Sequence, residues 1–144
     1  MTNSTTRRVL TATAIAGTLD ILAAIVLTLI YGRKIDAMLR YVASGPFPDA
    51  KHWGTAGAAL GLAVHFALMA IMAALYIVAA DRMARLKSQP LLWGVIYGAL
   101  TWIAMNWVVV PLRFGTTPSL VGAATQLFCH IVLVGIPIAY AARR

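Results

Sequence analysis

Four runs of apolar residues, each long enough to cross a lipid bilayer, constrain the fold of this chain more than any other feature. A membrane-spanning helix needs about 20 apolar residues, because the hydrocarbon core is about 30 Å thick and an α-helix rises about 1.5 Å per residue. The runs occupy residues 9–31, 55–80, 91–112 and 119–142. Turns or charged residues separate them. We therefore predict an all-α integral membrane protein in which residues 1–144 form a single domain, an antiparallel four-helix bundle.

The composition supports this class. Hydrophobic residues make up 61% of the 144 residues and charged residues 11%, whereas soluble domains have about 45–50% apolar and about 25% charged residues. A soluble globule and a disordered chain are therefore excluded. The formal net charge of +8 would suggest nucleic-acid binding in a soluble protein, but the basic residues stand at the ends of the apolar runs. The partner that we predict is the lipid bilayer and not nucleic acid.

The connection between the first two runs contains a second, shorter apolar pattern. Ile35, Met38, Leu39 and Val42 follow one another at helical spacing, which predicts a short amphipathic helix over residues 34–44. Two prolines beyond it end the helix. We interpret this helix as lying in the outer headgroup layer, where it covers the mouth of the bundle. A substrate gate is the alternative interpretation.

The distribution of basic residues predicts the orientation. Cytoplasmic flanks of membrane spans carry an excess of Lys and Arg. With the N-terminus inside, seven basic residues lie on the inner side and five on the outer side: Arg7, Arg8, Arg82, Arg85, Lys87, Arg143 and Arg144 against Arg33, Lys34, Arg40, Lys51 and Arg113. This bias predicts that both termini are cytoplasmic.

Polar side chains near the middle of the runs are the candidate functional residues. Asp20, His65 and His130 are ionisable, and such residues are costly inside a membrane and therefore rare. Asn106 and Gln126 add amides at a similar depth. We predict that these five side chains form an intramembrane polar cluster inside the bundle.

Three functions fit such a cluster. The first is the movement of protons or of a small solute, since imidazole and carboxylate groups exchange protons readily. The second is a redox subunit in which His65 and His130 ligate a b-type haem from opposite faces. The third is a structural or accessory subunit, in which the cluster only fixes helix packing. Two histidines and one aspartate are too few for a predicted metal site, and no catalytic motif is present, which favours a function other than catalysis.

Glycines indicate where helices approach one another. Gly57 and Gly61 share a helix face with His65, and Gly122 shares one with Gln126 and His130. Gly94 and Gly98 stand one turn apart in the third run. Small residues allow close contact between membrane helices, so we predict packing on these faces. Pro137 lies within the fourth run, where it predicts a kink that frees the carbonyl of Leu133.

Several segments resemble those of a family of small four-span bacterial inner-membrane proteins that has no assigned activity. They are Thr18-Leu19-Asp20, Val42-Ala43-Ser44-Gly45, Ala59-Leu60-Gly61-Leu62-Ala63-Val64-His65-Phe66, Gly94-Val95-Ile96-Tyr97-Gly98, Val109-Val110-Pro111-Leu112 and residues 130–139. The resemblance implies a four-span fold in a bacterial plasma membrane and transfers no catalytic residue. We consider two kinds of assembly: a homodimer, and a larger membrane complex in which this chain is an accessory subunit.

Overall fold

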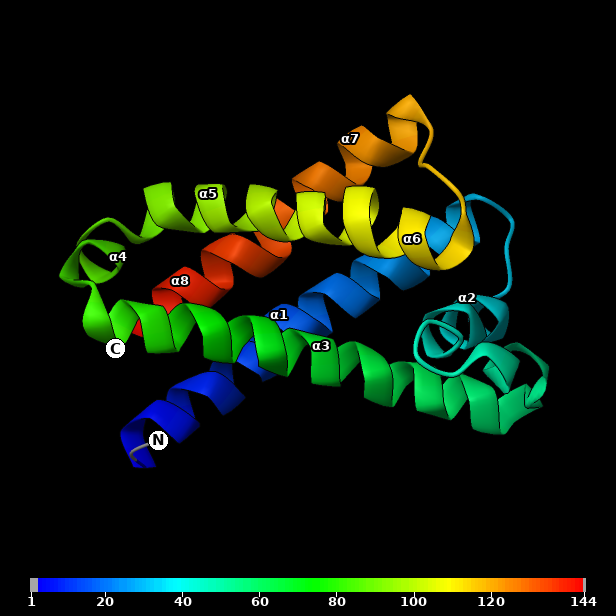
Figure 1. Ribbon diagram of the computed structural model, residues 1–144, viewed down its shortest axis with the longest axis horizontal. Coiled ribbons are helices and arrows are strands. Elements are labelled where there is room, and N and C mark those ends of the chain that lie inside the picture. The colour runs from blue at the N-terminus through cyan, green and yellow to red at the C-terminus, as the bar shows by residue number, and fades with distance from the viewer. Residues whose placement is uncertain (1–2, 144) are drawn as a thin grey trace.

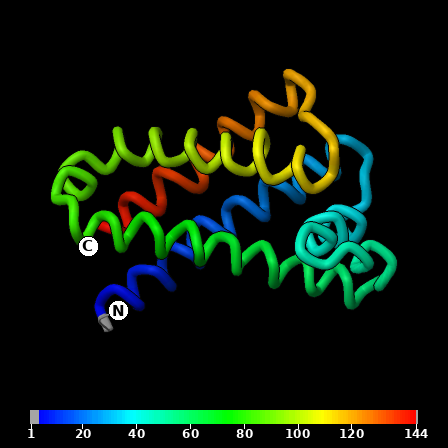
Figure 2. The backbone as a smooth tube through the Cα atoms, in the orientation of Figure 1, coloured from blue at the N-terminus to red at the C-terminus, as the bar shows by residue number. Residues whose placement is uncertain are grey.

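The computed structural model describes residues 3–143, in which helices are joined by short turns and loops and no strand occurs (Figure 1, Figure 2). The elements are α1 (Asn3–Ile30), α2 (Ile35–Ala43), the 3-10 helix η1 (Pro48–His52), α3 (Gly54–Arg82), α4 (Ala84–Ser88), α5 (Pro90–Ile103), the π-helix η2 (Ala104–Val109), α6 (Val110–Phe114), α7 (Leu120–Cys129), the π-helix η3 (His130–Gly135) and α8 (Ile136–Arg143).

The four predicted long apolar helices are present. They run over Ser4–Ile30, Gly54–Arg82, Pro90–Phe114 and Leu120–Arg143, and each is long and apolar enough to cross a membrane. The third comprises α5, η2 and α6, and the fourth comprises α7, η3 and α8. Most helix ends lie within two residues of the predicted ones, but α1 begins several residues before residue 9. The short predicted helix over 34–44 is α2.

The two ends of the molecule differ in structure. The start of α1, α4 and the end of α8 lie together at one end, here called the terminal end, and α2, η1 and α6 lie at the other, here called the α2 end (Figure 1). Between them, α8 packs against α1, α3 and α5, and η3 packs against α1 and α5. At the α2 end, α2 packs against α3.

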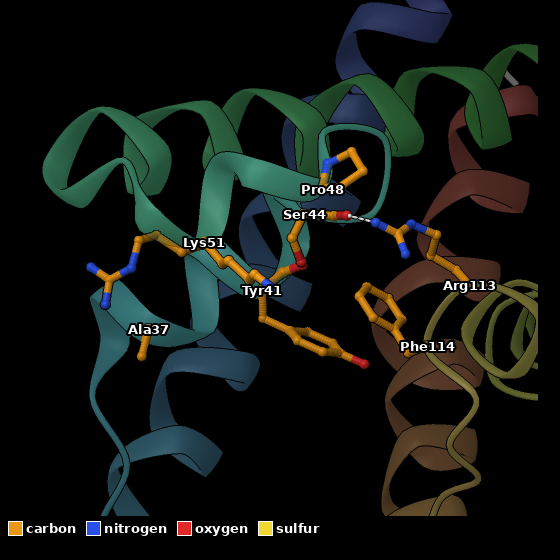
Figure 3. Close-up of a pocket in the computed structure, with 8 residues that line it drawn as sticks. Ala37, Tyr41, Ser44, Pro48, Lys51, Arg113 and Phe114 are labelled. Atoms are coloured by element: carbon orange, nitrogen blue, oxygen red, sulfur yellow. Dashed lines mark hydrogen bonds between the residues drawn. The ribbon is translucent and has the colours of Figure 1, made fainter.

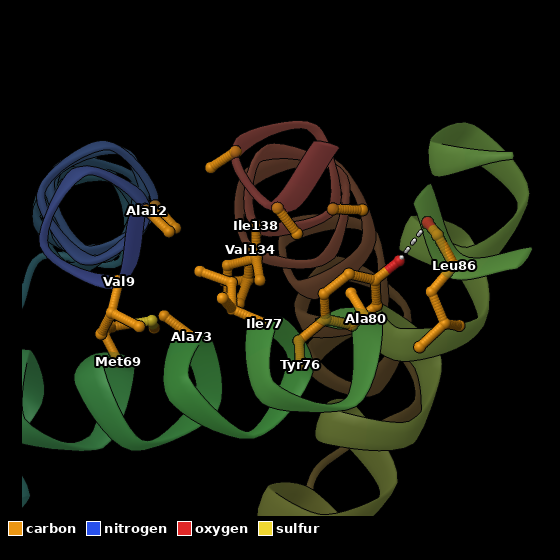
Figure 4. Close-up of a cluster of buried hydrophobic side chains, with 14 residues drawn as sticks. Val9, Ala12, Met69, Ala73, Tyr76, Ile77, Ala80, Leu86, Val134 and Ile138 are labelled. Atoms are coloured by element: carbon orange, nitrogen blue, oxygen red, sulfur yellow. Dashed lines mark hydrogen bonds between the residues drawn. The ribbon is translucent and has the colours of Figure 1, made fainter. Parts of the chain in front are cut away.

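The buried apolar core lies toward the terminal end (Figure 4). It is built largely from alanines, such as Ala12, Ala73 and Ala139, which are fully buried. Ile77 and Ile138 supply the largest fully buried side chains. Small side chains permit the close approach of the helices, whereas many large apolar side chains point outward.

The glycine faces pack against different partners. A Cβ atom at Gly94 or Gly98 would run into the backbone of η3 and α8, as the prediction of a close helix contact requires. A Cβ at Gly61 would meet the carbonyl of Leu39, so this glycine admits α2 and not another long helix. At Gly122 a Cβ would meet only the hydroxyl of Ser119, the N-cap of the same helix. The predicted helix contact at Gly122 is therefore absent from the described residues.

Each π-helix ends two residues before a proline. The N–H of Val110 donates to the carbonyl of Met105, and that of Ile136 to the carbonyl of Ile131, five residues back in each case. Pro111 and Pro137 follow. A proline ring collides with the carbonyl four residues before it in a regular α-helix. A wider turn relieves this collision and satisfies the neighbouring backbone groups. At Pro137, where the sequence predicts a kink, the structure has a π-helix that ends two residues before the proline.

A network of ionic hydrogen bonds joins the helices at the terminal end. Asp81 of α3 accepts bonds from Arg8 and Thr5 of α1 and from Lys87 of α4. Arg8 also donates from Nη1 to the carbonyl of Ala142 in α8, over 3.1 Å. These contacts tie together α1, α3, α4 and α8.

Candidate functional site

Asp20 and His65 face each other between α1 and α3. Oδ2 of Asp20 lies 3.9 Å from Nδ1 of His65, and their side chains are 17% and 10% exposed. The other ring nitrogen of His65, Nε2, lies 2.9 Å from the carbonyl oxygen of Gly17, one turn before Asp20. The absence of a Cβ at Gly17 makes room for the ring of Phe66, which follows His65. The glycine thus sets the spacing at which α1 presents Asp20 to His65.

His130 is the third member of the cluster. It is buried at the start of η3, and Nδ1 lies 2.9 Å from the carbonyl oxygen of Gln126, one turn earlier in α7. Asp20 interacts electrostatically with both His65 and His130. Asp20 of α1 and His65 of α3 thus face each other directly, and His130 of η3 is linked to Asp20 only through charge; we call these three residues the Asp20 cluster.

The backbone carbonyls determine the tautomers of both histidines. A carbonyl oxygen only accepts hydrogen bonds, so Nε2 of His65 and Nδ1 of His130 carry the hydrogens. The atom of His65 that gains or loses a proton is therefore Nδ1, which faces Asp20. In His130 it is Nε2. A separation of 3.9 Å suits one bridging water or a small side-chain movement.

The two amides of the predicted cluster are placed differently. Gln126 contributes its backbone carbonyl to His130. Asn106 lies in η2 and donates from Nδ2 to the carbonyl of Trp102, over 3.3 Å, in its own helix. Among the described residues it makes no hydrogen bond to the Asp20 cluster. Sequence depth alone placed Asn106 there, but depth does not fix the direction in which a helix presents a side chain.

A cavity leads from the α2 end toward the Asp20 cluster. Its volume is about 820 Å³, and it lies between α1, α2, the loop before α7 and α7 itself. Its wall carries hydroxyl groups, among them those of Thr28 and Thr125. Ala24 and Gln126 also line it, and each is four residues, about one helical turn, from Asp20 and His130 respectively. The cavity thus extends to within one turn of the cluster on two helices.

On the other side of the cluster the helices are closely packed. Ala16, four residues before Asp20, is fully buried, and so is Val134, four residues after His130. Both belong to the apolar core that continues to the terminal end. The cluster therefore has, on one side, a cavity whose wall mixes apolar side chains with hydroxyl groups, and on the other a filled apolar core.

The contacts of His65 and of the glycines do not favour a haem between two helices. Nε2 of His65 is occupied by the carbonyl of Gly17, and Nδ1 faces Asp20. The glycines that would make room for a macrocycle are covered by backbone, Gly61 by α2 and Gly98 by η3. Within residues 3–143, no group of three or more His, Cys, Asp or Glu side chains is arranged to hold a metal ion.

Comparisons of the chain with protein-family models, with curated proteins and with solved structures find no match.

Proposed function

We propose that this chain is a multi-pass membrane protein whose four long helices cross a bilayer in alternating directions, as an antiparallel bundle. Their lengths of 24 to 29 residues support this arrangement, as do the mean hydropathies of 1.6 to 2.3 over an 18-residue stretch of each helix. Large side chains such as Leu10, Leu75, Leu100 and Phe128 are exposed along the helices. Lipid tails would cover such a surface, which water would not solvate well.

The proposed orientation places the terminal end in the cytoplasm of a bacterial cell and the α2 end outside its inner membrane. The excess of basic residues near the terminal end supports this orientation. The resemblance described above supports the bacterial inner membrane. In this orientation the cavity is open to the outer side, and the apolar core together with the Asp81 network closes the inner side.

For the activity, we propose the movement of protons, or of a small polar solute together with protons, through the Asp20 cluster. The observation that carries this proposal is the cavity that ends one turn from Asp20 and His130. A cluster that only fixed helix packing would not need an approach lined by hydroxyl groups. Intramembrane carboxylates and imidazoles are the groups that proton relays use.

The tautomers define the first step of such a relay. A proton that arrives through the cavity binds to Asp20 or to Nε2 of His130. It then passes between Oδ2 of Asp20 and Nδ1 of His65, directly after a small movement or through one water. Nε2 of His65 keeps its hydrogen bond to Gly17, so the ring holds its orientation while Nδ1 changes its protonation state. Release on the inner side requires a rearrangement of the packed core.

The structural or accessory subunit is the second candidate function. The hydrogen bonds of His65 to Gly17 and of His130 to Gln126 favour it, because they join buried groups in the way that stable helix packing requires. In that case the exposed apolar surfaces would contact a second copy of the chain or a larger membrane complex.

Reconstitution in liposomes separates the two candidates. Proton uptake is followed with an enclosed pH-sensitive dye under a potassium diffusion potential. We expect flux above that of empty liposomes for the native chain, and loss of flux for Asp20→Asn, which keeps the shape and the hydrogen-bonding groups but does not titrate. Asn106→Ala is the matched control, since Asn106 lies outside the cluster, and it should retain the flux.

The folded state of each variant is checked by its thermal transition in detergent. Asp20→Asn should fold like the native chain, whereas Asp20→Leu should also lower the transition temperature. Proton flux that persists in Asp20→Asn would contradict the relay. A native chain without flux would leave the structural or accessory role as the better candidate.

A further inference from the structure

A second, smaller cavity lies at the α2 end, between the C-terminal half of α2, η1 and α6 (Figure 3). Its volume is about 490 Å³. Its wall has three cationic side chains, two aromatic side chains and one serine: Arg40, Lys51, Arg113, Tyr41, Phe114 and Ser44. No residue that lines it, within the described part of the chain, is acidic. The cavity is therefore electropositive.

Arg113 is held in place at one side of this cavity. Its Nη2 donates to the carbonyl of Ser44 over 2.8 Å (Figure 3). Its Nε donates to the carbonyl of Gly45 over 2.7 Å. Its guanidinium carbon lies 5.2 Å from the centre of the Phe114 ring. These contacts fix the guanidinium plane and leave Nη1 without a hydrogen-bond partner among residues 3–143. An ordered arginine with an unused donor is suited to bind an oxyanion.

Lys51 and Arg40 add two more positive charges to the wall of the cavity, beside that of Arg113. Lys51 has neither an ion pair nor a hydrogen bond within the described residues, and its side chain lies beside Tyr41 in Figure 3. Arg40 uses Nη1 in an ion pair with Asp36, at 2.6 Å. Three cations thus line the cavity, and the structure shows a carboxylate partner for only one of them within residues 3–143. An anion in the cavity would reduce their mutual repulsion.

Two stacked aromatic rings form another side of this cavity. The centroids of Tyr41 and Phe114 lie 4.3 Å apart, at an interplanar angle of 24°. Since Tyr41 belongs to α2 and Phe114 to α6, the stack holds the two elements together beside Arg113. The stack also provides an apolar surface next to the cationic side chains. One ligand with a charged group and an apolar part could therefore contact both surfaces.

We propose that this cavity binds a phosphate group, carried by a phospholipid headgroup or free in solution. A phosphate has several oxygens at tetrahedral positions and accepts charge-assisted hydrogen bonds from Arg and Lys. If the four helices cross the bilayer as proposed above, the α2 end lies at the depth of the headgroups. Only the lipid source depends on the proposal that the helices cross a bilayer, because a free phosphate would reach the same donors without a membrane.

The test uses the full chain purified in detergent. Three probes are compared by equilibrium binding: inorganic phosphate, phosphatidylglycerol, and a diacylglycerol with the same acyl chains but without the phosphate. The test variant is Lys51→Gln. The matched control is Lys34→Gln, which removes the same charge from the same end but from a residue that does not line this cavity. The thermal transition of each variant confirms that the chain is folded.

We expect phosphatidylglycerol to bind at least several-fold more tightly than the diacylglycerol. Lys51→Gln should weaken its binding by roughly tenfold, the equivalent of one charge-assisted hydrogen bond, and Lys34→Gln by less than twofold. Inorganic phosphate that binds with the same dependence on Lys51 supports the site and shows that the free anion suffices. Binding of phosphatidylglycerol alone supports the site with a lipid source. The proposal is overturned if neither phosphate-containing probe binds, or if the two variants weaken binding equally.

Discussion

Arg8 and Asp81 form a two-point ion pair between the first and second long helices. Nη2 of Arg8 lies 2.7 Å from Oδ2 of Asp81, and Nη1 lies 2.9 Å from Oδ1. The arginine side chain is 12% exposed and the carboxylate 30%. Parallel bonds of this kind fix both the distance and the relative orientation of two side chains. Because Arg8 also reaches the carbonyl of Ala142, the pair holds α1 against α3 and α8 at the same time.

Replacing Asp81 by Asn should destabilise the fold. The change removes the charge that Arg8 and Lys87 share, and we expect a loss of about 1.5–3 kcal/mol, the range for hydrogen bonds to charged groups. The measurement is the thermal transition in detergent. Asp49→Asn is the matched control, since Asp49 is exposed in η1 and has no ion pair among the described residues. Equal transition temperatures for the two variants would show that the network contributes little.

A methyl group added at Gly98 should disrupt the contact between α5 and η3. The new Cβ would collide with the backbone of His130 and Ile131, and overpacking of this kind costs about 1–3 kcal/mol. We therefore expect Gly98→Ala to lower the transition temperature. Gly122→Ala provides the comparison, because only the Ser119 hydroxyl lies near that site. If both variants were equally stable, the close contact at Gly98 would be in doubt.

Topology reporters test the proposed orientation. A reporter fused after Arg144 should be active on the cytoplasmic side, and one inserted between Pro46 and Asp49 should be active on the outer side. The physical reason is the excess of basic residues at the terminal end. The opposite labelling would reverse the orientation. It would also place the opening of the larger cavity on the cytoplasmic side.

The carboxyl group of Asp36 should titrate below the ordinary range of aspartates. The hydrogen bond from Arg40 lowers its pKa from 3.8. Since the folded pKa lies below the unfolded one, the pair stabilises α2 above the unfolded pKa, and this stabilisation is lost as the pH falls through the folded pKa. The chemical shift of the Asp36 carboxyl carbon gives the titration directly. Arg40→Gln should return the pKa toward 3.8; an unchanged titration would show that Arg40 is not the cause.

The sequence was sufficient to predict the long helices and the short one. Each apolar run is about as long as a bilayer-spanning helix must be, and this length predicts the long helices. The apolar residues between 35 and 42 recur with a helical period, which predicts the short helix. The approach of Asp20 to His65 also followed from the rarity of ionisable groups at this depth. These predictions depend on properties that a helix carries by itself.

Features that depend on how helices face one another could not be predicted in the same way. Gly61 has the spacing of a contact between long helices, but α2 occupies that face. Asn106 lies at a suitable depth, yet its amide bonds within its own helix. The binding of Arg113 to the carbonyls of Ser44 and Gly45 joins residues almost 70 positions apart. Nothing in the local sequence around Arg113 indicates that contact.

The two π-helices have a consequence for how the length of this chain can change. A π turn contains one residue more than the α turn that it replaces. Deleting a residue from α3 would rotate everything beyond it by about 100°, because an α-helix has about 3.6 residues per turn. Deleting one from Ala104–Val109 would instead restore a regular turn and leave both flanking faces in place, provided that Pro111 were replaced as well. The surplus residue and the proline therefore form a unit that is gained or lost together.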